Sequence, residues 1–155
     1  MHHATADPYK IPTNRMEILL AEDNVEDANV TIQALRQDKV RRRVTLVCNG
    51  EEAIRFLHRD GEFALAPKPD LILLDMFLPK KEGHDVLAEI RADVELKDIP
   101  VIVLTGSLVH RATLEAKGLH VDGFMKKPVD LDKFIAVVKS IHRSWLTELV
   151  LSSIV

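Results

Sequence analysis

The chain has 155 residues, of which 46% are hydrophobic and 29% are charged, a length and balance that suit one compact globular domain. Twenty-one basic and 24 acidic residues give a formal net charge of −3, which excludes a general attraction to nucleic acid or to an anionic membrane. Cys48 is the only cysteine, so an intrachain disulfide is excluded and a reducing, cytoplasmic compartment is expected. No apolar run approaches the length of a membrane span, and residues 1–16 lack an apolar signal core and are expected to be a leader.

Short apolar runs alternate with helical patterns along the chain. The runs predict strands at 18–21, 44–48, 71–74, 101–104 and 123–126. A helix is expected around 111–117, and apolar residues at helical spacing predict four more, with these stripes: Ala28, Ile32 and Leu35; Ala53 and Leu57; Val86, Leu87 and Ile90; Phe134, Val138, Ile141 and Trp145. This alternation predicts an α/β fold in which a parallel sheet is covered on both sides through right-handed crossovers.

Polar side chains follow four of the predicted strands directly. They are Glu22 and Asp23 after the first strand, Asp75 after the third, Thr105 after the fourth, and Lys126 and Lys127 after the fifth. Because the carboxyl ends of parallel strands meet at one edge of a sheet, we expect these side chains to lie together.

The residue types at this edge indicate a particular chemistry. Three carboxylates repel one another unless a cation holds them, and an acidic pocket of oxygen ligands suits Mg²⁺. The lysine and the threonine hydroxyl suit a tetrahedral anion bound against the metal. Together they predict a phosphoryl-transfer site with an aspartyl acceptor.

Each residue also has a structural alternative. Asp23 or Asn24 can cap the following helix, Asp75 can be a turn residue, and Lys127 can be a solvated lysine. Thr105 with residues 106 and 107 can be a strand end before a helix cap. Their order at the ends of four strands favours the functional interpretation.

Four motifs carry a resemblance to a known family: ILLAEDN at 18–24, LILLDMFLPKKEG at 71–83, VIVLTGS at 101–107 and FMKKP at 124–128. In combination they resemble the CheY-like receiver domains of response regulators, from Ile18 to about Ser144. The resemblance implies a doubly wound, flavodoxin-like parallel sheet of five strands in the order 2-1-3-4-5. The expected organisation is a leader at 1–16, a receiver domain at 17–144 and an apolar extension at 145–155.

The resemblance also implies roles for individual residues. Asp75 matches the phosphoacceptor. The implied ligands of Mg²⁺, for which Mn²⁺ could substitute, are Glu22, Asp23, Asp75 and the backbone carbonyl of Phe77. The implied phosphoryl-stabilising residues are Lys127, Thr105, Met76 and Gly106, and the implied switch residues are Thr105 and Phe124. The peptide bond between Lys127 and Pro128 is a candidate cis bond.

Two residues depart from the family pattern. Glu22 stands where aspartate is commoner, and its longer side chain suits a metal contact through water. Phe77 is bulky where smaller or polar residues are frequent, so its ring can screen attacking water while its carbonyl still binds metal.

The implied function is that of a stand-alone signalling protein. Only residues 145–155 follow the last predicted helix, too few for an output domain, so we expect a single-domain response regulator that takes a phosphoryl group from a histidine kinase. It is expected not to be an enzyme, although it assists its own phosphotransfer and autodephosphorylation. The LAEI and GEF stretches and the tail SWLTELVLSSIV resemble the response regulators of bacterial phytochrome kinases.

Two alternatives come from other classes of protein. An Mg²⁺-dependent aspartyl phosphatase usually has a second aspartate two residues after the nucleophile, where this chain has Phe77. A receiver-like interaction module that works without phosphorylation normally lacks part of the acidic pair, the acceptor or the lysine, all of which are present here. Of the seven histidines, His2 and His3 are expected to belong to the leader, the other five lack the paired spacing of a metal site, and none is assigned a role.

The last helix and the tail carry more apolar surface than one small sheet covers. We therefore expect a symmetric homodimer whose interface includes Ile135, Trp145, Leu146, Leu149 and Val150. The alternative is a tail that folds back on its own domain.

Overall fold

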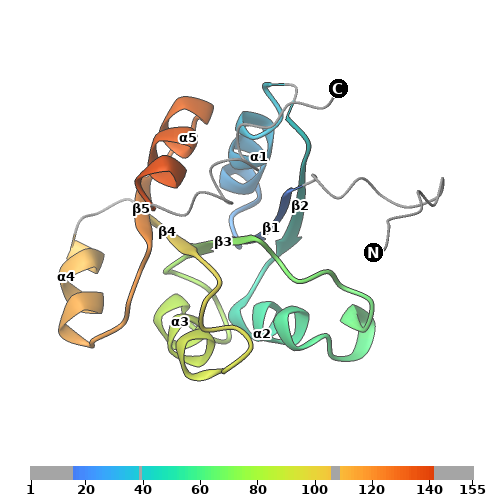
Figure 1. Cartoon of the computed structure of the whole chain (residues 1–155), viewed down its shortest axis with the longest axis vertical. Helices are drawn as coiled ribbons and strands as arrows, with labels where there is room; N and C mark the ends of the chain where they lie inside the picture. Colours follow the sequence, from blue (N-terminus) through green and yellow to red (C-terminus); the bar gives the residue numbers. More distant parts are fainter. Residues whose placement is uncertain (1–15, 39, 106–108, 142–155) are drawn as a thin grey trace, which may run out of the picture.

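The centre of the protein is a parallel sheet of five strands in the order β2-β1-β3-β4-β5, as Figure 1 shows. The structure is a computed structural model, and it describes residues 16–38, 40–105 and 109–141. The strands are β1 (Met16–Ala21), β2 (Arg42–Val47), β3 (Leu71–Asp75), β4 (Val101–Thr105) and β5 (Gly123–Lys126). The predicted strands and the predicted strand order are confirmed.

Helices cover both faces of the sheet. They are α1 (Val25–Ala34), α2 (Gly50–His58), α3 (Gly83–Ala92), α4 (Val109–Ala116) and α5 (Leu131–Ser140), and a short 3-10 helix, η1 (Gly61–Phe63), follows α2. Helices α1 and α5 lie on one face, and α2, α3 and α4 lie on the other (Figure 1). Among the described residues, no helix combines the length and the apolar character needed to cross a membrane.

The two faces of the sheet form two separate hydrophobic cores. Within β3, Leu71 and Leu73 pack with the side chains of α1 and α5, whereas Ile72 and Leu74 pack with those of α2 and α3. Each of these four residues is almost completely buried. A strand with a core on each side needs no polar alternation, which is why LILL is an unbroken apolar run.

The helical stripes are mostly as predicted, with one difference in α1. Ala28 and Leu35 are buried, but Ile32 is only half-buried, and Thr31 is buried although the apolar pattern omitted it. A threonine offers a methyl group to the core, so apolar periodicity alone does not detect it. In α5, Phe134 and Val138 are buried and Ile141 is half-buried, whereas Trp145 lies outside the described residues.

The register of the strands determines which polar residues meet. Ala21 of β1 is paired with Leu74 of β3, so Glu22 and Asp75 come next on neighbouring strands. Thr105 at the end of β4 is paired with Lys126 of β5, and Lys127 follows. The backbone N–H of Lys127 donates a hydrogen bond to the Thr105 carbonyl over 3.2 Å. The pairing therefore brings the acids, the threonine and the lysine to one edge of the sheet.

Candidate functional site

Three carboxylates meet at the carboxyl edge of the sheet. Glu22, Asp23 and Asp75 each offer an oxygen, and these oxygens lie within 4.8 Å of one another. Glu22 is 1% exposed and Asp75 is 4% exposed, whereas Asp23 is open to solvent. The structure thus brings together the acidic residues that the sequence singled out.

Lys127 supplies the opposing positive charge. Its Nζ lies 2.6 Å from Oε1 of Glu22 and 3.0 Å from Oδ2 of Asp75. A third carboxylate, Oδ2 of Asp27 in α1, lies 3.1 Å from the same Nζ. Asp27 is not among the residues predicted for this edge, because its contact with a lysine 100 positions away leaves no local signal in the sequence.

The burial of this cluster changes its proton affinities. Burial raises the pKa of Glu22 to about 7, and the hydrogen bond and the negative charge of Asp75 act in the same direction. Burial by itself would lower the pKa of Lys127, but its contacts with Glu22, Asp75 and Asp27 outweigh burial and raise that pKa. Lys127 is therefore a permanent cation in a pocket where negative charge is crowded.

The donor set fits a hard divalent cation. Carboxylate oxygens are the ligands that Mg²⁺ prefers, and a cation between Glu22, Asp23 and Asp75 would offset the burial and the nearby Asp75 carboxylate that together raise the pKa of Glu22. Asp23, which faces solvent, is the open side of this set.

Asp23 and Asn24 are both candidates for the N-cap of α1, and only Asn24 takes that place. Asn24 is the N-cap of α1, because its Oδ1 accepts a hydrogen bond from the backbone N–H of Asp27 over 2.9 Å. The backbone N–H of Asn24 also donates to Oε2 of Glu22 over 3.2 Å. Asp23 is therefore not the helix cap and stays available to a ligand.

The residues around Asp75 fall into buried and exposed groups. Thr105 and Met76 are buried beside the sheet edge. The backbone N–H of Phe77 donates to Oδ1 of Asp75 over 3.1 Å, so this peptide lies against the carboxylate, but Phe77 itself is 71% exposed. The peptide bond between Lys127 and Pro128 is cis, as predicted. Gly106 lies outside the described residues.

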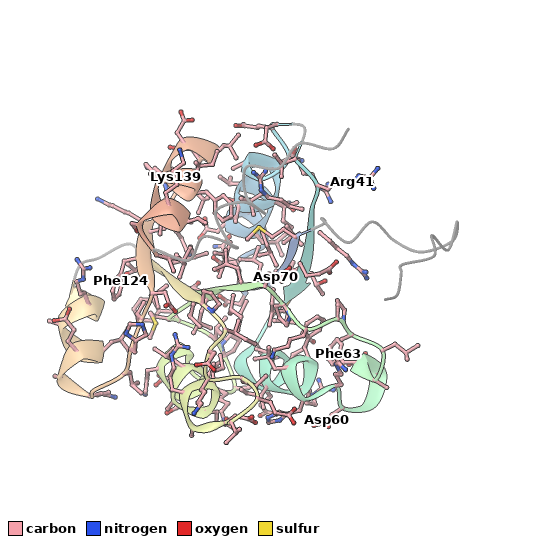
Figure 2. The ribbon with its side chains drawn as sticks, viewed as in Figure 1. Arg41, Asp60, Phe63, Asp70, Phe124 and Lys139 are labelled. Atoms are coloured by element: carbon pink, nitrogen blue, oxygen red, sulfur yellow. The ribbon has the colours of Figure 1, made fainter. Side chains whose placement is uncertain are left out.

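Phe124 belongs to β5, and its side chain faces α4 (Figure 2). Its ring is half-buried against the core on the α2–α3–α4 face, and the guanidinium of Arg111 lies 4.8 Å from the ring centroid. Of the predicted dimer residues, Ile135 is half-buried on α5 and packs on the opposite core. Trp145, Leu146, Leu149 and Val150 lie outside the described residues.

Two glycines allow the loop after β3 to pack closely. A Cβ at Gly83 would lie 2.5 Å from the backbone oxygen of Asp75, so only glycine fits at the start of α3. A Cβ at Gly50 would lie 1.9 Å from the backbone oxygen of Lys81, and the Gly50 N–H donates to the Pro79 carbonyl over 3.3 Å. The first residue of α2 therefore supports the loop that carries Phe77.

Gly50→Ala should reduce the free energy of unfolding by about 2 kcal/mol, because the new methyl group must displace backbone atoms. Urea unfolding measures the loss. Gly118→Ala is the control, since Gly118 has φ +69° with open space around its Cβ position, and its cost should be about 1 kcal/mol from backbone strain alone. A smaller loss for Gly50→Ala than for Gly118→Ala would contradict the role of the close contact.

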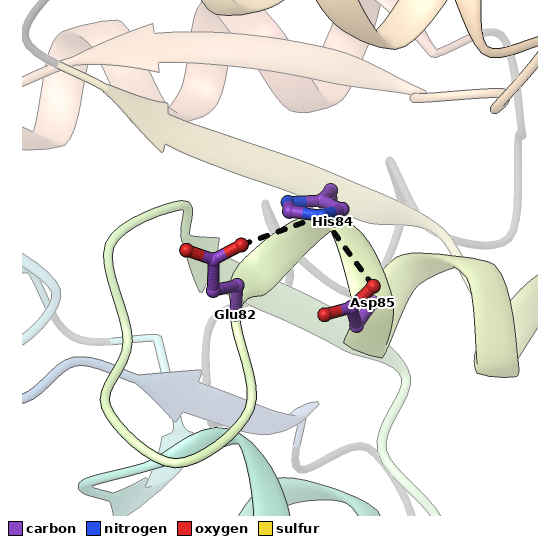
Figure 3. A group of neighbouring side chains, drawn as sticks. All are labelled: Glu82, His84 and Asp85. Carbon is purple, nitrogen blue, oxygen red and sulfur yellow. Dashed lines mark ion pairs between the residues drawn. The ribbon is translucent and has the colours of Figure 1, made fainter.

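A second group of potential ligands lies at the start of α3 (Figure 3). Nε2 of His84 lies 3.4 Å from carboxylate oxygens of both Glu82 and Asp85, and the two acids are largely exposed. The first turn of a helix carries partial positive charge and disfavours a cation. These contacts are those of surface ion pairs, and no role is assigned to His84.

Comparisons with known proteins agree with this geometry. The response regulator receiver domain family matches residues 18–139. Response regulator Rcp1 of Synechocystis sp. is 37% identical over 129 residues, which cover 83% of this chain and 88% of Rcp1. The Mn²⁺-bound structure of Rcp1 has a TM-score of 0.70 at 35% identity, over 90% of this chain and 99% of that one.

Two further solved structures are similar. The phosphorylated cyanobacterial phytochrome response regulator RcpA is 41% identical with a TM-score of 0.71, over 86% of this chain and 95% of that one. The bacteriophytochrome response regulator RtBRR is 34% identical with a TM-score of 0.77, over 83% of this chain and 79% of that one. The strand order, the acidic edge and these matches lead to one conclusion: the chain belongs to the response regulator receiver domain family.

Proposed function

We propose that the chain is a single-domain response regulator that accepts a phosphoryl group on Asp75 from a histidine kinase. The observation that carries the proposal is the contact of Lys127 Nζ with Asp75 at 3.0 Å inside a pocket of further carboxylates. A buried aspartate paired with a lysine has both a nucleophilic oxygen and a cation for the charge that develops.

The reaction is a transfer between two residues. An oxygen of Asp75 attacks the phosphorus of a phosphohistidine, the new O–P bond forms as the N–P bond breaks, and the imidazole leaves with a proton from solvent. Lys127 balances the negative charge on the transferring oxygens, and the hydroxyl of Thr105 and the backbone N–H groups of Met76 and Gly106 are the further donors proposed for them. Mg²⁺ held by Glu22, Asp23, Asp75 and the Phe77 carbonyl, or Mn²⁺ in its place, would supply additional positive charge.

The partner proposed is a bacterial phytochrome histidine kinase. The support is the similarity to RcpA, RtBRR and Rcp1, two of which are named as phytochrome or bacteriophytochrome response regulators. Large apolar side chains beside the site are also open to a partner, since Val25 and Phe77 are both mostly exposed. The lone cysteine, Cys48, is free, which fits the cytoplasmic location that we propose with this kinase.

Phosphotransfer from a set of purified histidine kinases tests the proposal. The label should move from a phosphorylated bacteriophytochrome kinase to this chain faster than from unrelated kinases. Hydrolysis of a generic phosphate ester would favour the aspartyl phosphatase instead. A chain that takes no label from any kinase or small donor would be the phosphorylation-independent module.

As a signalling protein, the chain is proposed to assist its own phosphorylation and autodephosphorylation and to transmit the change through Thr105 and Phe124. Receiver function is assigned to residues 17–144, with 1–16 as a leader and 145–155 as an apolar extension. The half-buried position of Phe124 beside α4 supports its part in this, because the core encloses only part of the ring.

The metal site should depend on Asp23 more than on Glu22. Asp23→Ala is expected to weaken Mg²⁺ binding by about 100-fold and Glu22→Ala by about 10-fold, because the exposed Asp23 is proposed as a direct ligand while Glu22 is engaged by Lys127. Calorimetric Mg²⁺ titration measures both, and Glu26→Ala, an exposed acid in α1, should bind as the unchanged chain does. Equal or reversed losses would refute the ordering.

A homodimer through α5 and residues 145–155 is proposed as the working assembly. The described part of this surface is α5, where Ile135 is only half-buried. The apolar composition of residues 145–155 is the support for including them in the interface. Sedimentation of the full chain, at micromolar concentration both without and with phosphorylation of Asp75, should show a dimer that Ile135→Glu weakens. A monomer under these conditions, with Asp75 phosphorylated, would rule the dimer out.

A further inference from the structure

Asp27 is a partner of Lys127 for which the sequence motifs give no role. It lies in the first turn of α1, 100 positions before the lysine, and its Oδ2 is 3.1 Å from Nζ. One ammonium group is thus shared by three carboxylates, those of Glu22, Asp75 and Asp27.

The three carboxylates differ in their access to water. The side chain of Glu22 is 0% exposed, and that of Asp75 is nearly as buried, so neither can leave the lysine for solvent. The side chain of Asp27 is 44% exposed and can turn to water at little cost. Asp27 is therefore the partner that an incoming anion can displace.

A phosphoryl group on Asp75 would bring about −1.5 to −2 of charge to this place. It would need the same ammonium group that Asp27 contacts, and the carboxylate of Asp27 would repel it. The charge of Asp27 hence acts against the anion twice, by sharing Lys127 and by direct repulsion.

We propose that Asp27 is a positioning residue that lowers the affinity of the site for a phosphoryl group. Its carboxylate pairs with Lys127 in the unphosphorylated chain, and this ion pair breaks when Asp75 is phosphorylated. This inference rests on the proposed function of Asp75 as phosphoacceptor.

Replacing the side chain of Asp27 should leave the site assembled. Glu22 and Asp75 still hold Lys127, and the hydrogen bond to the Asn24 cap comes from the backbone N–H of residue 27, which a substitution keeps. The remaining loss is the favourable interaction of an acid with the helix N-terminus. Glu26 lies in the same first turn and is exposed, so Glu26→Gln is the control for that loss.

The test uses beryllium trifluoride, a stable phosphoryl mimic, with excess Mg²⁺ and the full chain. Titration followed by fluorine NMR of the bound anion gives its affinity directly. Asp27→Asn and Asp27→Ala should bind the anion about fivefold more tightly than the unchanged chain. Asp27→Glu, which keeps the charge, and Glu26→Gln should bind it as the unchanged chain does.

Several results would overturn the inference. Unchanged or weaker binding in Asp27→Asn and Asp27→Ala would show that the Asp27 charge does not oppose the anion. Tighter binding in Asp27→Asn alone would assign the effect to the new amide, and equal tightening in Glu26→Gln would assign it to general charge. If the unchanged chain fails to bind the anion with Mg²⁺, the proposed function of Asp75 fails and the inference fails with it.

Discussion

Asp75→Asn should abolish phosphorylation by acetyl phosphate and Mg²⁺, because an amide oxygen cannot form the acyl phosphate and the pocket loses its nucleophile. The folded structure should remain, since the amide has the size of the carboxylate and Lys127 keeps its contact with Glu22. Intact-protein mass spectrometry after a fixed incubation measures the fraction that carries one phosphoryl group.

Asp70→Asn is the matched control for this loss. Asp70 also borders β3, but it lies at the opposite end of the strand, where its Oδ2 accepts a hydrogen bond from the Glu17 N–H over 2.8 Å. The control should take up phosphate as the unchanged chain does. Undiminished labelling of Asp75→Asn would place the acceptor on another residue.

Arg91→Met should reduce the free energy of unfolding by about 3 kcal/mol, because it removes the guanidinium that pairs with a buried carboxylate. Nη2 of Arg91 lies 2.8 Å from Oδ2 of Asp122, whose side chain is only 5% exposed. Arg91 also donates to three backbone carbonyls, those of Lys97, Ile99 and His120. The same Oδ2 accepts from the Val101 N–H, so the pair joins α3, the start of β4 and the loop before β5.

Urea unfolding at neutral pH measures this loss, with Arg111→Met as the control. Arg111 forms its ion pair with Glu115 on the surface of α4, where both side chains are mostly exposed, and its cation–π contact with Phe124 adds about 0.5–1 kcal/mol at such a site. Such pairs contribute about 0–1 kcal/mol, so the control should lose little. Similar losses in the two variants would contradict the importance assigned to the buried pair.

The sequence predicts most of the fold because the two-core sheet leaves a simple pattern. The run LILL at 71–74 indicates a strand buried on both sides, and the structure gives β3 as Leu71–Asp75. Parallel pairing then predicts that Glu22, Asp75, Thr105 and Lys127 meet at one edge, because their positions follow from the strand ends alone.

The features that the sequence does not reveal depend on contacts between distant segments. Asp27 and Asn24 both read as polar residues at a helix start, and only the placement of Lys127 distinguishes the lysine partner from the helix cap. The Arg91–Asp122 pair spans 31 positions and has no periodic signal. In the sequence Gly50 is an ordinary residue at a helix start, and only the structure shows that the backbone of Lys81 lies where its Cβ would be.

Borohydride trapping of the phosphorylated chain identifies the residue that carries the phosphoryl group. Reduction converts an aspartyl phosphate to homoserine, and peptide mass spectrometry locates the modified residue after transfer from a histidine kinase with Mg²⁺. Homoserine is expected at position 75, and none is expected in a parallel reaction with the metal chelated. Homoserine at another acid, or none at position 75 while phosphate is bound elsewhere, would contradict the assignment of Asp75 as phosphoacceptor.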